Sequence, residues 1–461
     1  MRVDRMIESP PFTLLSFLFY HPEPKKGENM KGLNLLRAAL LCATVMLCAC
    51  SGGSSDGAGS NTPTPTPAPG TGLTYYFSDC QAGAEASCVA GDNANAGTSA
   101  AAPKQDLGGI DVNALPAGSQ LLFACGGAWN WTNLRLENPN ATSTLPLVFD
   151  AYGSGARPVF FAPDIATAAI DFGEYNNTTN DGGYTIRNIK FDGMGSSAWG
   201  FFLIHNLHHV TIENTEITGF HIGIHAQTRA PYGVTNVVIR NNDISYNDGM
   251  GILGQFSDSV IEGNLFEGNN FSGSGFNHGT YLSGNADGGR NLVLRNNRYI
   301  RNSVLDGVCE GGNMTFHGQM DGVLIEGNVI EQDAGAPGCW AMSITQGYDT
   351  AEWFRNFVVR DNTIINAGNT AINAQSAPGI LVADNVVINT QSTPQTAISV
   401  GHNEYQNGDV PDGNAVVRDN TACYPTPHAN SSVVRVTAPD SQVTNNVMVT
   451  GAAAATGVCA R

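Results

Sequence analysis

The chain has 461 residues, of which 42% are hydrophobic and 13% are charged, and 54 of them are glycines. This composition excludes a disordered chain and is typical of a globular protein with a sizeable core. The formal net charge of −18 argues against nucleic acid or an anionic lipid surface as a partner, because both call for a basic face.

The first 49 residues are predicted to lie outside the folded protein. Residues 1–29 are predicted to be untranslated, because they look like an over-long assignment of the start codon. From Met30 a short basic region with Lys31 and Arg37 precedes an apolar run that ends in LCAC at residues 47–50. This pattern resembles a bacterial lipoprotein signal peptide over residues 30–49, which implies that Cys50 is lipidated and that acyl chains anchor the protein. By the same resemblance, the serine after Cys50 favours the outer membrane or cell surface. A plainly cleaved signal or a transmembrane anchor is the alternative.

Residues 50–72 form a glycine- and serine-rich tract followed by alternating threonine and proline. Such a segment buries no core and behaves as a semi-extended tether. We therefore expect one folded domain over residues 73–461, held away from the membrane.

The cysteines of this domain suit an oxidising compartment. They show no CxxC or Cys/His spacing of the kind that binds a metal ion. The pairing of five of them stays open on sequence alone: Cys80, Cys88, Cys125, Cys423 and Cys459.

A short repeat dominates the chain after residue 180. Its copies begin with TIRNIKF and TIENTEI, continue through VIRNNDI, VIEGNLF, VLRNNRY, LIEGNVI, VVRDNTI, LVADNVV and VVRDNTA, and close with QVTNNVM. Each copy is a short β-type run, and the spacing of 22 to 35 residues fits one coil of a solenoid.

One position of the repeat is nearly always asparagine. Stacked coils place equivalent residues about 4.8 Å apart, so these side chains can hydrogen-bond along the stack as a ladder. Ile189 and Thr215 occupy the position in the first two copies, and the asparagines are Asn242, Asn264, Asn297, Asn328, Asn362, Asn385, Asn420 and Asn446.

These motifs resemble right-handed parallel β-helix proteins of the pectate-lyase-like superfold. The resemblance covers nearly all of residues 73–461 and implies an all-β solenoid, with a small N-terminal cap and first coils over 73–180 and regular coils over 181–450. It also implies activity on polysaccharides, most specifically that of a polysaccharide lyase, although many unrelated activities share the architecture.

Three consecutive coils carry extra residues before one of their strands, at 267–279, 300–313 and 331–340. Stacking would place these inserts side by side as a wall, which a disulfide between Cys309 and Cys339 would pin. Later inserts at 347–357 and 402–414 follow their strands and would form the opposite bank. Loops on a rigid solenoid face are where such proteins carry function.

The wall borders three predicted strands, TYLSG at 280–284, MTFHG at 314–318 and MSITQ at 342–346. Alternation with Leu282, Phe316 and Ile344 inward makes two rows face outward. One row is Tyr281, Thr315 and Ser343, and the other is Ser283, His317 and Thr345. A polar strand surface beside a wall predicts a groove.

β-Elimination in a uronic-acid chain needs a base for the C5 proton, an acid for the leaving oxygen and a partner for the carboxylate. The candidate acids and bases are His278, Tyr281 and His317. Arg295 is a further catalytic candidate as carboxylate partner, and the predicted substrate-binding residues are Arg290, Arg298, Trp340, Gln346 and Tyr348. The expected partner is an acidic polysaccharide, bound by a monomer. Each of these side chains also has a purely structural interpretation.

No cofactor is required by the sequence. Calcium could bind Asp306, Glu310 or Asp321, although their spacing matches no calcium motif. Two alternatives to a lyase stay open. A glycoside hydrolase would need two carboxylates across the sugar, and a non-catalytic polysaccharide-binding adhesin would need only the groove.

Overall fold

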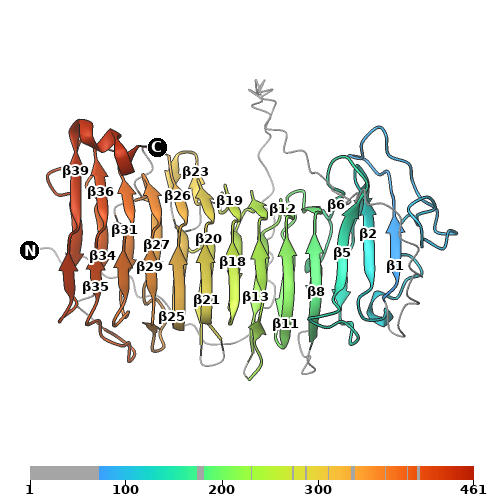
Figure 1. The fold of residues 1–461 in the computed structure, drawn as a ribbon, viewed down its shortest axis with the longest axis horizontal. Helices are drawn as coiled ribbons and strands as arrows, with labels where there is room; N and C mark the ends of the chain where they lie inside the picture. Colours follow the sequence, from blue (N-terminus) through green and yellow to red (C-terminus); the bar gives the residue numbers. More distant parts are fainter. Residues whose placement is uncertain are drawn as a thin grey trace, which may run out of the picture. The chain divides into compact units, whose positions relative to one another are not determined.

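Each coil of the repeat contributes one strand to each of three parallel sheets, which stack coil by coil in sequence order (Figure 1). The computed structural model describes residues 72–460, apart from 174–180, 230, 273–274, 286–287, 310, 334–337, 369, 392 and 402–404. The all-β parallel β-helix expected from the repeat is thereby confirmed. The proposed signal peptide, Cys50 and the linker lie outside the described residues.

Along one coil the chain passes through sheet I, sheet II and sheet III in turn. Sheet I comprises β4 (Leu134–Leu136), β7 (Ala168–Phe172), β10 (Trp199–Ile204), β13 (Ile222–Gln227), β17 (Met250–Gly254), β20 (His278–Gly284), the first half of β25 (Gly312–Glu326), β27 (Trp340–Ile344), β31 (Thr370–Ala374), β34 (Thr396–Val400) and β37 (Ser432–Val436).

Sheet II includes the second half of β25, which therefore joins sheets I and II. Its other strands are β1 (Thr74–Phe77), β2 (Gln120–Ala124), β5 (Leu147–Tyr152), β8 (Asp181–Arg187), β11 (Leu207–Glu213), β14 (Val234–Thr235), β15 (Val238–Arg240), β18 (Ser259–Glu262), β21 (Arg290–Arg295), β28 (Trp353–Arg355), β29 (Val358–Arg360), β32 (Leu381–Ala383), β35 (Val416–Arg418) and β38 (Gln442–Thr444).

Sheet III comprises β3 (Ala128–Asn130), β6 (Val159–Phe161), β9 (Lys190–Asp192), β12 (Glu216–Thr218), β16 (Asp243–Ser245), β19 (Leu265–Glu267), β22 (Arg298–Ile300), β26 (Val329–Glu331), β30 (Thr363–Ile365), β33 (Val386–Ile388), β36 (Thr421–Tyr424) and β39 (Val447–Thr450). A small hairpin of β23 (Val304–Leu305) and β24 (Val308–Cys309) and the 3-10 turns η1 (Val112–Ala114), η2 (Gly451–Ala455) and η3 (Gly457–Cys459) complete the elements. No helix among the described residues is long and apolar enough to span a membrane.

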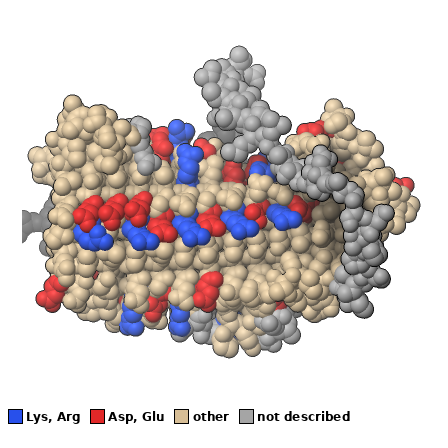
Figure 2. All heavy atoms as spheres, viewed as in Figure 1, with Lys and Arg blue, Asp and Glu red and all other residues tan. Residues whose placement is uncertain are grey.

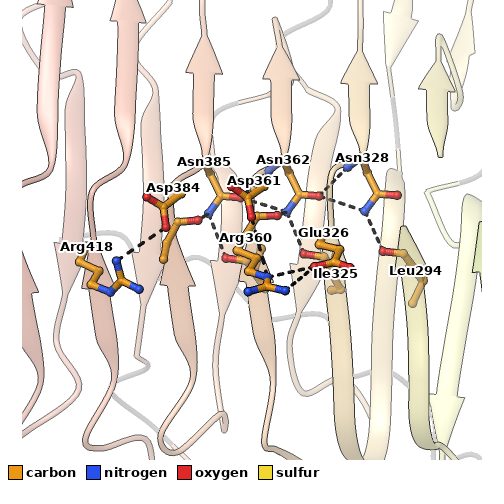
Figure 3. Close-up of polar contacts among 12 residues, drawn as sticks. Leu294, Ile325, Glu326, Asn328, Arg360, Asp361, Asn362, Asp384, Asn385 and Arg418 are labelled. Carbon is orange, nitrogen blue, oxygen red and sulfur yellow. Dashed lines mark hydrogen bonds and ion pairs between the residues drawn. The ribbon is translucent and has the colours of Figure 1, made fainter. Parts of the chain in front are cut away.

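The predicted asparagine ladder is confirmed at the turn between sheets II and III. Asn328 Nδ2 donates to Asn362 Oδ1 over 2.9 Å, and Asn362 Nδ2 donates to Asn385 Oδ1 over 3.0 Å (Figure 3). Each Oδ1 also accepts the backbone N–H of the preceding ladder residue, and each Nδ2 also donates to a backbone carbonyl such as Ile325 O. The ladder therefore satisfies polar groups that are buried inside every turn.

The residue before each ladder position has a left-handed backbone, with φ between 48° and 65°. Only glycine, asparagine and aspartate visit this region at little cost, which explains the NN, GN and DN pairs of the repeat. These residues are Asn188, Asn214, Asn241, Gly263, Asn296, Gly327, Asp361, Asp384, Asp419 and Asn445.

A second, shorter asparagine ladder lies at the turn between sheets III and I. Asn247 Nδ2 donates to Asn269 Oδ1 and Asn269 Nδ2 to Asn302 Oδ1, both over 3.0 Å, and Asn302 Nδ2 donates to Asn313 Oδ1 over 3.2 Å. Asn313 Nδ2 then donates to the carbonyl of Trp340 over 3.0 Å. This ladder underlies the coils that carry the three inserts, so the inserts rise from a fixed base.

Acidic and basic side chains alternate along the outer face of sheet II, in line with the stack (Figure 2). Arg295 belongs to this row: it pairs in register with Glu262 on one side and Glu326 on the other, and its Nε lies 2.6 Å from Glu262 Oε2. The pairs are half exposed, so each contributes at most about 1 kcal/mol. The prediction of Arg295 as a catalytic residue is therefore corrected: the arginine faces outward from sheet II and is occupied by glutamate.

Three disulfides are formed among the described residues: Cys80–Cys88, Cys309–Cys339 and Cys423–Cys459. The second is the bridge expected from the sequence, and it joins two neighbouring inserts. The third ties η3 to β36.

Replacing both Cys309 and Cys339 by serine is expected to lower the free energy of unfolding by about 3.5 kcal/mol, because the bridge closes a sequence separation of 30 residues. The matched control is the Cys80/Cys88 double serine variant, whose separation is 8 residues and whose loss should be about 1 kcal/mol smaller. Denaturant unfolding measures both. An equal or smaller loss for the Cys309/Cys339 variant would contradict the expectation.

Candidate functional site

The outer face of sheet I over β20, β25 and β27 has the alternation predicted from the sequence. Leu282, Phe316 and Ile344 are fully buried in the core. In the register between strands, Tyr281 pairs with Thr315 and Thr315 with Ser343, while Ser283 pairs with His317. The first predicted outward row is therefore formed in full, and the second is formed between Ser283 and His317, whereas Thr345 follows the end of β27.

The inserts rise on both sides of this face. On the side that precedes the strands, the backbone N–H of Ser303 donates to Asn269 O over 2.7 Å, which holds two inserts together in addition to the disulfide. On the other side, Asn407 Nδ2 donates to Tyr348 O over 3.3 Å, so the inserts at 347–357 and 402–414 also meet. We call the outer strand face between these two sets of contacts the groove.

Four rings form a continuous row in the groove. The ring centroids of His278 and Tyr281 lie 5.5 Å apart, those of Tyr281 and His317 5.2 Å apart, and those of His317 and Tyr348 5.2 Å apart. The hydroxyl oxygens of Tyr281 and Tyr348 are 2.9 Å apart and hydrogen-bonded. The imidazole of His317 therefore contacts both tyrosine rings, whose hydroxyl groups are hydrogen-bonded to each other.

His317 faces a buried carboxylate that the sequence analysis did not identify. Its Nδ1 lies 3.5 Å from Oε1 of Glu352, whose side chain is fully buried, whereas 15% of the His317 side chain is exposed. Gly347 packs directly against the imidazole, where a side chain would clash with the ring. Nδ1 makes no hydrogen bond within the described part of the chain, so Glu352 lies close enough to attract a protonated imidazole but does not select its neutral tautomer.

Backbone groups hold Glu352 in place. Its carboxylate accepts the N–H groups of Gly318 over 2.5 Å, of Tyr348 over 2.7 Å and of Gly347. The backbone N–H of Glu352 donates to Asp409 Oδ1 over 2.9 Å. Burial alone would raise the pKa of Glu352, but the nearby His317 and the hydrogen bonds from the three backbone groups hold it below its ordinary value. Glu352 is therefore ionised behind His317.

Both groove tyrosines are held neutral. Burial raises the pKa of Tyr281, and the nearby Tyr348 and Glu352 raise it further. Burial likewise raises the pKa of Tyr348, although its hydrogen bonds to Tyr281 and Ser283 act in the opposite direction. The hydroxyl pair can therefore donate a proton but does not lose one to water at neutral pH.

His278 has a fixed tautomer. Its Nδ1 accepts the backbone N–H of Gly312 over 2.9 Å, so the proton of the neutral ring lies on Nε2. Burial and, to a smaller extent, the neighbouring His317 lower the pKa of His278 to about 3. His278 thus stays neutral and can act as a hydrogen-bond donor. The geometry does not support the expected base role, because its acceptor nitrogen is occupied.

The neutral state of His278 makes stability depend on pH. Since its folded pKa lies below the ordinary value of 6.5, its contribution is present above pH 6.5 and is lost as the pH falls toward 3. His278→Asn, which keeps an acceptor for Gly312, is expected to flatten the decline in unfolding free energy between pH 6 and pH 4 by up to about 1.4 kcal/mol per pH unit. Denaturant midpoints across this range test it. An unchanged slope would show that His278 does not titrate there.

The remaining predicted residues are distributed over several surfaces. Arg290 begins β21 on sheet II and Arg298 begins β22 on sheet III, so these arginines stand on other sheets than the groove strands, which corrects their predicted role. Trp340 begins β27 beside the wall and is 43% exposed. Gln346 follows β27, and both polar atoms of its buried amide lack a partner within the described part of the chain.

The predicted calcium ligands do not converge. Asp306 lies in the turn between β23 and β24, whereas Asp321 is on the sheet II half of β25 and accepts from Asn356 Nδ2 over 2.6 Å. Glu310 lies outside the described residues. Within the ranges that the structure describes, no three His, Cys, Asp or Glu side chains are grouped as metal ligands.

Comparisons with known proteins agree with this architecture. Residues 176–343 match a family model described as a right handed beta helix region. The fold is a right-handed parallel β-helix. No curated protein sequence matches the chain.

Solved structures of low sequence identity resemble this chain. A structure described as a rhamnogalacturonan lyase is 13% identical, with a TM-score of 0.51 over 81% of this chain and 87% of that one. The surface adhesin PfbA of Streptococcus pneumoniae is 14% identical, with a TM-score of 0.48 over 72% and 85%. A GH136 lacto-N-biosidase from Eubacterium ramulus is 13% identical, with a TM-score of 0.47 over 82% and 68%. At such identities the similarity shows the fold alone.

Proposed function

We propose that the protein is a polysaccharide lyase that cleaves a uronic-acid-containing glycan by β-elimination in the groove of sheet I. The observation that carries the proposal is the His317–Glu352 pair beneath two hydrogen-bonded tyrosines. A base with a buried carboxylate behind it and a neutral hydroxyl acid beside it are the two groups that the elimination needs.

In the proposed reaction, His317 Nε2 removes the C5 proton of the uronate, and Glu352 stabilises the imidazolium that forms. The electron pair of the C5–H bond becomes the C4–C5 double bond while the C4–O bond breaks. The Tyr281 hydroxyl donates its proton to the departing oxygen. The reaction yields one sugar chain with a new unsaturated uronate end and one chain with a restored hydroxyl, and no water is consumed.

The uronate carboxylate must be made less negative for its C5 proton to leave. Neutral hydrogen-bond donors near His317 and Glu352 can reduce the negative charge of the carboxylate. The buried hydroxyl of Thr315 and the buried amide of Gln346 lack hydrogen-bond partners among the described residues, and His278 has its proton on Nε2. Unmatched donors are costly unless a ligand pairs with them, so we assign them to the substrate carboxylate in place of the predicted arginines.

A glycoside hydrolase is less well supported by the groove. Such an enzyme needs two carboxylates about 5 to 9 Å apart across the sugar. The oxygens of Glu352 are already engaged by three backbone N–H groups, and Asp409 beside it accepts the backbone N–H of Glu352. A non-catalytic adhesin would not need an ionised carboxylate behind a histidine.

The proposal places the protein outside the cytoplasm. A lipid on Cys50 would tether the domain through the linker at the outer membrane or cell surface, where an acidic polysaccharide is accessible. Labelling with a radioactive fatty acid, compared between the natural chain and Cys50→Ala, tests this part independently of catalysis.

The reaction class is tested by incubating the protein with alginate, polygalacturonate, rhamnogalacturonan and glycosaminoglycans. A lyase produces ultraviolet absorbance from the new alkene conjugated to the carboxylate. New reducing ends without that absorbance would identify a hydrolase, and binding without either product would identify an adhesin.

Tyr281→Phe is expected to lower kcat roughly 10²-fold with little change in KM, because the variant keeps the ring but loses the proton donor. Steady-state rates of alkene formation measure this. The control is Tyr348→Phe, which keeps Tyr281 able to donate and should lose much less. If the two variants lost equal activity, Tyr281 would not be the acid.

A further inference from the structure

A second group of aromatic rings lies on the outer face of sheet I, in earlier coils than His317. Trp199 and Phe202 of β10 contact each other with ring centroids 4.5 Å apart, and His225 of β13 lies 4.5 Å from Trp199 and 5.0 Å from Phe202. Phe202 packs with Ala168 and Ile204 in a cluster separate from the main core, with Trp199 half-buried against it. We call Trp199, Phe202 and His225 the aromatic platform.

The platform shares a register with the catalytic rings. Phe202 pairs with His225, His225 with Leu253, and Leu253 with Tyr281 on successive strands. Strand spacings of about 4.8 Å place Phe202 about 14 Å and His225 about 10 Å along the stack from Tyr281. Between the two stand the apolar side chains of Ile222, Met250 and Leu253. One sugar chain lying along sheet I would therefore contact both groups of rings.

One polar atom of the platform is buried without a hydrogen-bond partner. Nδ1 of His225 is buried and has no hydrogen-bond partner within the described part of the chain. Burial lowers the pKa of His225 to about 4, so the ring is uncharged at neutral pH. An apolar ring surface with one unmatched polar atom suits the C–H face and a hydroxyl of a pyranose ring.

The charges near the platform disfavour a uronate. Arg135 of β4 lies in the same register row, but Asp171 separates it from Phe202. The Nε of Arg135 lies 3.9 Å from Glu137 Oε1. The strands β10, β13 and β17 contain no lysine or arginine. Asp171 pairs in register with Phe202 on the preceding strand, and its buried side chain is bonded to Asn133 Nδ2 over 2.8 Å. A second carboxylate brought beside it would be desolvated and repelled.

We infer that the aromatic platform is a binding subsite for an uncharged sugar, so that the substrate is a heteropolysaccharide in which neutral sugars accompany the uronates. The inference rests on the proposed function for the identity of the groove as a glycan site. It adds that a homopolymer of uronate alone fits the groove poorly at the platform.

The test measures binding and turnover separately. Binding of rhamnogalacturonan, in which a uronate alternates with a neutral 6-deoxy sugar, and of polygalacturonate, which is uronate throughout, is measured by calorimetry. Trp199→Ala is expected to weaken rhamnogalacturonan binding about tenfold and to change polygalacturonate binding little. The matched control is Tyr246→Asn. Tyr246 follows the end of β16, and its aromatic side chain is 55% exposed. Asparagine suits the left-handed φ of 56° at this position.

The outcomes separate the two proposals. A selective loss in Trp199→Ala without any alkene formation by the natural protein would support the subsite and overturn the lyase. Unchanged rhamnogalacturonan binding in Trp199→Ala, an equal loss for polygalacturonate, or no glycan binding by the natural protein would overturn the subsite. A rise in KM for rhamnogalacturonan at constant kcat would support both.

Discussion

His317→Ala is expected to lower kcat for alkene formation by roughly 10²- to 10⁴-fold, the range that a positioned general base contributes. The fold should be retained, because His317 faces outward and its neighbour Phe316 carries the core contact. Steady-state rates and thermal unfolding measure the two effects. The control is His428→Ala, which changes an exposed histidine outside the groove and should keep full activity.

Glu352 is a positioning residue, because it acts on the substrate through His317. Its removal should therefore lower kcat with little change in KM. In Glu352→Gln the imidazolium that forms during proton transfer loses its carboxylate partner, whereas the amide oxygen can still accept from the backbone N–H groups that hold the insert. A rise in KM as large as the fall in kcat would assign Glu352 a purely structural role and would leave His317 without its proposed partner.

Asn328→Leu is expected to lower the free energy of unfolding by at least about 3 kcal/mol. Asn328 Oδ1 accepts both the backbone N–H and the side-chain Nδ2 of Asn297, each over 3.0 Å. The variant leaves that backbone N–H and one N–H of the Asn297 amide buried and unpaired, while the other amide N–H still donates to Ile261 O. Each such group costs about 1–3 kcal/mol. Leu294 O and Asn362 Oδ1 would also lose the amide that donates to them.

The control for the ladder variant is Asn296→Gly, one coil earlier and one residue outside the ladder. Asn296 has a left-handed φ of 55°, which glycine adopts without strain, and it is exposed. Its substitution should change the unfolding free energy by less than about 0.5 kcal/mol. Denaturant midpoints measure both variants. Equal losses would mean that the ladder does not carry the stability assigned to it.

The periodic parts of the structure could be predicted from sequence because one rule repeats in every coil. The ladder asparagine sets the register, and alternation from it correctly placed Leu282, Phe316 and Ile344 in the core and Tyr281 and His317 outside. The position of the wall followed from insert lengths, and the Cys309–Cys339 bridge followed from the stacking of adjacent inserts.

Two features of the site could not be predicted in this way. Glu352 lies in an insert that follows no period, and its carboxylate is held by backbone groups of Gly347 and Tyr348 in the same insert and of Gly318, 34 residues away. Two acidic residues, Asp349 and Glu352, stand in the aromatic insert YDTAEWF, and the sequence does not show which of them is buried.

Arg295 was misassigned for a different reason. It precedes the ladder asparagine Asn297 by two residues, and that spacing already fixes it on sheet II, whereas the groove is on sheet I. The alternation of Arg and Glu between successive coils was visible in the repeat and indicated paired charges rather than a substrate site.

The most direct test of the central claim is a crystal structure of Glu352→Gln or His317→Ala with an oligouronate bound. We predict one uronate ring over sheet I with its C5 facing the position of His317 Nε2, its leaving oxygen within hydrogen-bond distance of the Tyr281 hydroxyl, and its carboxylate toward Thr315 and Gln346. An oligouronate bound on sheet II or III, or one whose C5 lies away from both His317 and Tyr281, would contradict the proposed site.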